Sequence, residues 1–116
     1  MFKLIRDNIP EIIKEKGELC NFAQVQNPEL MAGMLRQKLI EEVNEFLTAD
    51  PTSDESLEEL VDIVTVIRTI YNIGGIDDEA FEKLYQEKLK ARGGFHNGYI
   101  MFLPDPVQQG QVDRDE

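Results

Sequence analysis

Two pairs of acidic residues have a spacing that could build a metal site. Glu42 precedes Glu45 by three residues, and Glu59 precedes Asp62 by three, so each pair would occupy adjacent turns of a helix. On a helical wheel, Glu42 and Glu59 both fall within the margin of an apolar stripe instead of opposite it. Acidic runs on helices are usually solvated surface, but this placement predicts half-buried carboxylates, which need a compensating cation.

The residue types favour a hard divalent cation. If the two helices pack antiparallel, the four carboxylates can converge, and carboxylate oxygens select Mg²⁺, with Mn²⁺ as an alternative. A helical di-iron site would need histidines in Glu-x-x-His pairs, whereas the one histidine, His96, follows a Gly-Gly pair. Neighbouring Glu41 and Glu58 lie on the wetter side of their helices, where each is either exposed charge or a group able to reach a second metal or a water.

Capping residues and breakers predict four helices that would position these groups. Two segments without helical spacing, near residues 19–25 and 98–103, are candidates for short strands. The predicted fold class is therefore all-α, a helical bundle of about four helices. Their expected ranges are Asp7 or Asn8 to Gly17, Asn27 to Thr48, Thr52 (as a capping box with Glu55) to Gly74, and Asp77 or Asp78 to Arg92.

The third predicted helix is apolar around well over half its circumference, so it must be buried on several sides. Four helices offer few neighbours, which favours a homodimer that completes the bundle. The alternative is that the first helix and the C-terminal segment cover this surface. In the last predicted helix, Lys88 and Arg92 fall within an apolar stripe. They either extend from its edge to water or point toward the acidic site and bind phosphate.

Composition limits the partners and the compartment. The 116 residues suffice for one domain, expected over residues 1–103 and followed by a polar, flexible tail over 104–116. A net charge of -11 argues against binding to nucleic acid or to an anionic membrane. The single cysteine, Cys20, excludes an intramolecular disulfide, and neither a signal peptide nor a membrane span is evident. We therefore expect a cytoplasmic protein.

These residues together resemble the MazG-like, all-α nucleoside triphosphate pyrophosphohydrolase superfamily, whose signature is E-x-x-E followed after a gap by E-x-x-D. Here EEVNE at 41–45 and ELVD at 59–62 are separated by thirteen residues. The flanking segments KLIRDNIP at 3–10, KLIEE at 38–42 and KLKARGGF at 88–95 are similar to the branch described as phosphoribosyl-ATP pyrophosphohydrolase-like, a group of house-cleaning enzymes. The resemblance covers roughly residues 2 to 103 and does not extend to the tail.

The resemblance implies hydrolysis of a nucleoside triphosphate, of a non-standard kind, to a nucleoside monophosphate and pyrophosphate, in a homodimer or higher assembly. It implies that Glu42, Glu45, Glu59 and Asp62 bind the metal, that Glu41, Glu42 or Glu45 orients the attacking water, and that the phosphate contacts come from Lys3, Arg6, Lys38, Lys88 and Arg92. For Arg6 and Asp7, a local ion pair or a helix cap is the alternative. Two other functions stay open: phosphoribosyl-ATP pyrophosphohydrolase of histidine synthesis, and a non-catalytic acidic binding module.

Overall fold

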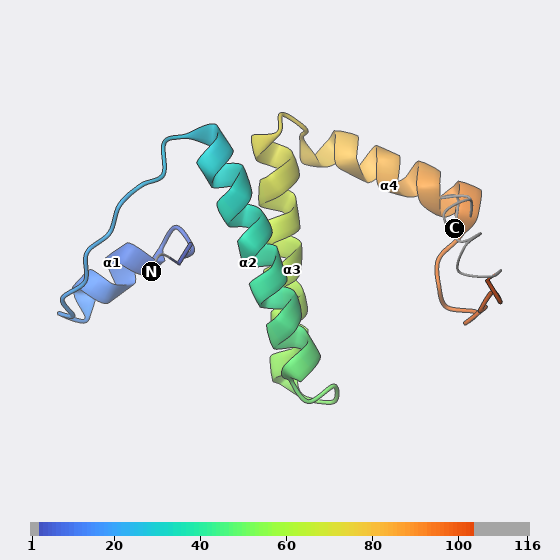
Figure 1. The fold of residues 1–116 in the computed structure, drawn as a ribbon, viewed down its shortest axis with the longest axis horizontal. Helices are drawn as coiled ribbons and strands as arrows, with labels where there is room; N and C mark the ends of the chain where they lie inside the picture. The colour runs from blue at the N-terminus through green and yellow to red at the C-terminus, as the bar shows by residue number, and fades with distance from the viewer. Residues whose placement is uncertain (1–2, 104–116) are drawn as a thin grey trace. The chain divides into compact units, whose positions relative to one another are not determined.

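The described residues, 3–103, contain four α-helices and no strand (Figure 1). They are α1 (Ile9–Glu15), α2 (Pro28–Thr48), α3 (Asp54–Ile73) and α4 (Asp78–Arg92). This confirms the all-α prediction. The two predicted short strands are wrong: residues 18–27 and 99–103 have no regular structure, and Leu19, Tyr99 and Phe102 are almost fully exposed. A strand requires a neighbour to accept its backbone hydrogen bonds, which neither segment has acquired.

The chain divides into two units, Met1–Gly75 and Ile76–Glu116. The first contains α1, α2 and α3, and the second contains α4. The predicted flexible tail, 104–116, lies outside the described residues. Among the helices of residues 3–103, none is both long enough and apolar enough to cross a membrane.

The second helix begins where its cap predicts. The Asn27 side-chain oxygen accepts hydrogen bonds from the backbone N–H groups of Glu29, at 2.9 Å, and Leu30, at 3.1 Å. Pro28 occupies the first turn, where its missing N–H is not needed. This fixed start sets the rotation of all later α2 residues, including the acidic ones, about the helix axis.

The turn between α2 and α3 is built on Asp50. Its carboxylate accepts hydrogen bonds from the backbone N–H of Thr52, at 3.0 Å, and from the Thr52 hydroxyl, at 2.9 Å. The hydrogen bonds from Thr52 lower the pKa of Asp50. Thr52 therefore does not cap α3, although the sequence predicts that it would. Ser53 caps α3 instead, because its hydroxyl accepts from the backbone N–H of Ser56 at 3.2 Å.

Glycines end the later helices. Gly75, with φ 92°, and Gly93, with φ 78°, have positive φ values that other residues rarely adopt, and each lies just after the end of its helix. Asp77 caps α4 by accepting from the backbone N–H of Ala80 at 2.8 Å. Asn8 occupies the N-cap position of α1, as predicted, but its side chain makes no capping hydrogen bond.

The helices α2 and α3 pack side by side as an antiparallel hairpin (Figure 1), which holds the core of the first unit. Leu35 is 3% exposed and Val66 8% exposed. The apolar surface of α3 extends well beyond this contact, and α1 does not cover it. Leu57, Leu60, Val61 and Val64 all remain exposed. An open groove in this region is lined by Leu60, Val61, Val64, Thr65 and Arg68.

Candidate metal centre

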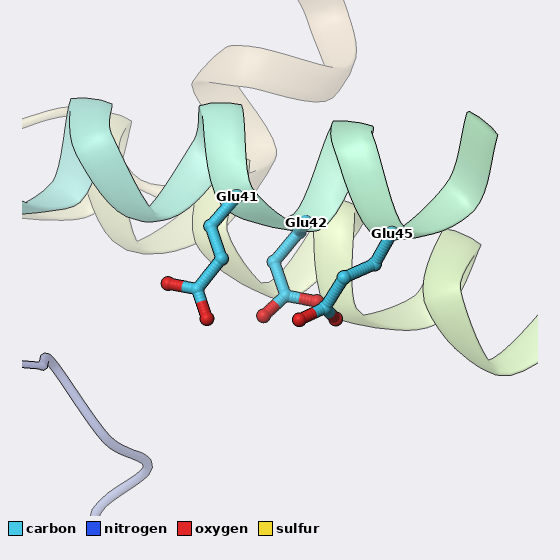
Figure 2. Close-up of side chains that lie close together, drawn as sticks. All are labelled: Glu41, Glu42 and Glu45. Carbon is cyan, nitrogen blue, oxygen red and sulfur yellow. The ribbon is translucent and has the colours of Figure 1, made fainter. Parts of the chain in front are cut away.

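Five carboxylates from the two packed helices gather on one side of the hairpin. Glu41, Glu42 and Glu45 of α2 offer oxygen atoms within 4.8 Å of one another. Glu42 also forms a second such group with Glu59 and Asp62 of α3, so it links the two groups. Figure 2 shows the three α2 side chains pointing to the same side, with the carboxylates of Glu42 and Glu45 adjacent. The hairpin thus brings the four paired carboxylates into two overlapping groups that share Glu42, with Glu41 in the first.

The centre of this acidic cluster, defined by Glu41, Glu42, Glu45, Glu59 and Asp62, is shielded from water. The Glu42 side chain is 8% exposed. One oxygen of Glu42 and one of Glu59 are buried without any hydrogen-bond partner. A buried carboxylate oxygen without a hydrogen-bond partner is energetically costly, so a nearby positive charge would stabilise both atoms. The prediction that Glu42 is enclosed is confirmed, while Glu59 is half-buried.

Crowding of these acids changes the acidity of Glu59. Burial of its side chain raises the pKa of Glu59 to about 7, together with the closeness of Glu45 and then of Glu42, whose negative charges favour the protonated form and whose carboxylates can accept its proton in a hydrogen bond. Near neutral pH, Glu59 therefore keeps a proton for part of the time, which reduces the repulsion among these carboxylates.

Lys38 is the enclosed counter-ion of the cluster. Its Nζ lies 3.2 Å from Glu42 Oε1 and 3.4 Å from Glu41 Oε1, and its side chain is 16% exposed. Partial burial alone would lower the pKa of Lys38, but the hydrogen bond to Glu42 and the charges of both glutamates outweigh it, so the pKa is raised. A lysine four residues before a glutamate on one helix reaches it naturally.

The segment before α1 brings two more cations to the same cluster. Arg6 Nη2 donates a hydrogen bond to Asp62 Oδ1 and lies 3.3 Å from Thr65 Oγ1. Lys3 Nζ lies 3.7 Å from Glu41 Oε1. Both side chains are more than half exposed. Arg6 thus pairs with a distant residue, and the ion pairs of residues 3–103 do not include the local pair with Asp7 that was the alternative.

Of the five predicted phosphate-binding residues, three lie at the cluster. Lys88 and Arg92 are exposed residues of α4, in the second unit, and their participation stays a prediction. Thr65, a contact of Arg6, is not among the residues that the sequence predicts at the site. Its position three residues after Asp62, on the same face of α3, was the available signal.

Comparison with protein-family models, with curated proteins and with solved structures finds no match to this chain.

Proposed function

We propose that this protein is a metal-dependent nucleotide pyrophosphohydrolase, which hydrolyses a non-standard nucleoside triphosphate to the monophosphate and pyrophosphate. The observation that supports it most is the pair of buried, unpartnered oxygens of Glu42 and Glu59 at the centre of five carboxylates. The three cationic side chains at the cluster balance only part of the charge of its five carboxylates. A divalent cation would therefore stabilise the site, and a bound cation attracts phosphate oxygens.

The carboxylates fit Mg²⁺, or Mn²⁺ in its place, because both ions prefer hard oxygen ligands. Glu42, Glu59 and Asp62 would hold the ion, with Glu45 completing the set. When bound, the metal supplies Lewis acidity toward phosphate oxygens and lowers the pKa of a coordinated water.

The protein groups would then position the two reactants. Glu41, Glu42 or Glu45 accepts a hydrogen bond from the attacking water and orients it toward the α-phosphorus. The new P–O bond forms as the bond to the bridging oxygen breaks, and pyrophosphate leaves. Cationic groups compensate the phosphate charge: Lys3, Arg6 and Lys38 at the cluster, with Lys88 and Arg92 of α4 as further candidates.

The proposal is tested by a pyrophosphate-release screen over normal and modified nucleoside triphosphates, with phosphoribosyl-ATP included, in Mg²⁺ or Mn²⁺. We expect Glu42→Gln and Glu59→Gln to lose most of the activity. Glu58→Gln is the matched control, since Glu58 is an exposed neighbour outside the cluster. Unchanged turnover in both cluster variants would rule out this site. Binding of Mn²⁺ without pyrophosphate release from any substrate would favour the non-catalytic binding module.

The proposed assembly is a homodimer, supported by the open apolar surface of α3. Leu57, Leu60, Val61 and Val64 follow helical spacing, and Val61 is 57% exposed. A second copy of this chain would bury them. Sedimentation equilibrium should give twice the 13.3 kDa chain mass for the unmodified protein and the single mass for Val61→Glu. Gln37→Glu adds the same charge at an exposed polar position and should leave the dimer intact. A monomeric unmodified protein would contradict this assembly.

A cytoplasmic location belongs to the same proposal. Cys20 is free and exposed, a state that a reducing compartment preserves.

A further inference from the structure

The Lys3–Arg6 segment connects the two halves of the acidic cluster from outside. Arg6 pairs with Asp62 of α3, and Lys3 pairs with Glu41 of α2, although the two cations are only three residues apart in the chain. The segment therefore places two positive charges against two different helices. In Figure 2 this part of the chain is the bluish tube that passes on the side toward which the carboxylates point.

These two cations are held differently from Lys38. The side chains of Lys3 and Arg6 are 66% and 53% exposed, whereas that of Lys38 is 16% exposed. Exposed ion pairs are weak and exchange readily with other partners, because water and salt screen them. Lys38 is thus a fixed counter-ion, and the N-terminal pair is exchangeable.

A divalent cation and Arg6 would compete for the carboxylate of Asp62. Asp62 pairs with Arg6, and it also forms a possible metal-binding group with Glu42 and Glu59. A metal bound there would repel the adjacent guanidinium and compete with it for negative charge. Its pairing with Asp62 would be weakened, and the guanidinium would remain next to the metal until an anion draws it away. A planar guanidinium binds phosphate oxygens through two parallel hydrogen bonds, so it is suited to the anion that the metal attracts.

We propose that the Lys3–Arg6 segment is an exchangeable strap, which neutralises the carboxylates in the metal-free protein and transfers its cations to the phosphates of a metal-bound ligand. This inference rests on the proposed metal-dependent function and adds a role to residues outside the metal ligands. It follows that Arg6 has opposite effects on two affinities. It weakens the binding of metal alone, and it strengthens the binding of an anion to the metal-loaded protein.

The experiment is a pair of calorimetric titrations. Without nucleotide, Arg6→Gln should bind Mn²⁺ about threefold more tightly than the unmodified protein, the range set by one exposed ion pair. With saturating Mn²⁺, the same variant should bind inorganic pyrophosphate about tenfold more weakly, as expected for a lost charge-assisted contact. Arg36→Gln removes the same charge from an exposed position on α2 and should change neither affinity.

The possible results distinguish a failure of this inference from a failure of the proposed metal-dependent function. Absence of Mn²⁺ binding to the unmodified protein overturns both. Normal Mn²⁺ binding combined with an unchanged or weaker affinity in Arg6→Gln overturns only the exchange, since Arg6 would then be inert or would position Asp62 for the metal. If Arg6→Gln unfolds, as judged by circular dichroism, Arg6→Lys replaces it. That variant keeps the charge and should bind Mn²⁺ normally but pyrophosphate more weakly.

Discussion

Metal binding should release a proton from the acidic cluster, in an amount that depends steeply on pH. The pKa of Glu59 is raised to about 7 by burial and by the neighbouring Glu45 and Glu42. A carboxylate must lose its proton before it binds a metal. The protons released per metal should therefore be about 0.9 at pH 6, about 0.5 at pH 7 and about 0.1 at pH 8, the protonated fractions of a group with that pKa.

Isothermal titration calorimetry with Mn²⁺ measures this number, when each pH is repeated in two buffers that differ in ionisation enthalpy. Glu58→Gln should reproduce the unmodified values, because Glu58 lies outside the cluster. Glu59→Gln removes the titrating group, so each Mn²⁺ that this variant still binds should release almost no proton at any of the three pH values. Release that is constant between pH 6 and pH 8, or that persists in Glu59→Gln, would refute the assignment of this proton to Glu59 and its neighbours.

Two further predictions concern folding. The pKa of Glu59 in the folded protein, about 7, lies above its ordinary value of 4.5, so the folded protein binds this proton more tightly than the unfolded chain does. The resulting stabilisation is complete below pH 4.5 and is lost as the pH rises through 7. The metal-free protein should show this as a falling melting temperature, with a flatter profile in Glu59→Gln, and equal profiles would contradict the raised pKa. In the core, Leu35→Ala should lower the free energy of unfolding by about 2–4 kcal/mol in urea titrations, since Leu35 is 3% exposed. Leu47→Ala, at a position 70% exposed, should change it little, and equal losses would refute the location of the core.

The helices were predictable because their ends depend on short-range chemistry. Asn27 with Pro28 fixes the start of α2, and Asp77 the start of α4, through hydrogen bonds within three residues. The start of α3 differs from the prediction because two adjacent hydroxyl residues, Thr52 and Ser53, compete for the N-cap position. The turn decides between them, since Asp50 captures Thr52. Such a choice depends on the three-dimensional path of the turn, which helical capping patterns do not describe.

Within the candidate site, helical geometry predicted orientation but not long-range partners. The position of Glu42 at the margin of an apolar stripe correctly implied its burial, because the stripe is what packs against α3. The pairing of Arg6 with Asp62 joins residues 56 positions apart, and no periodic pattern encodes it. The ion pair between Lys38 and Glu42 can be predicted from the sequence, because residues four apart on one helix lie next to each other.

The charge balance of the acidic cluster links the number of metal ions to the N-terminal strap. The cluster has five carboxylates and three cations, Lys38, Lys3 and Arg6, which leaves two negative charges uncompensated when Glu59 is ionised. That deficit equals the charge of one divalent ion. If Lys3 and Arg6 exchange to the phosphates of a ligand, the carboxylates retain only Lys38, and the deficit becomes four, the charge of two divalent ions. Metal alone should therefore bind the unmodified protein with a stoichiometry of one, and a second ion should enter together with the anion that draws the strap away.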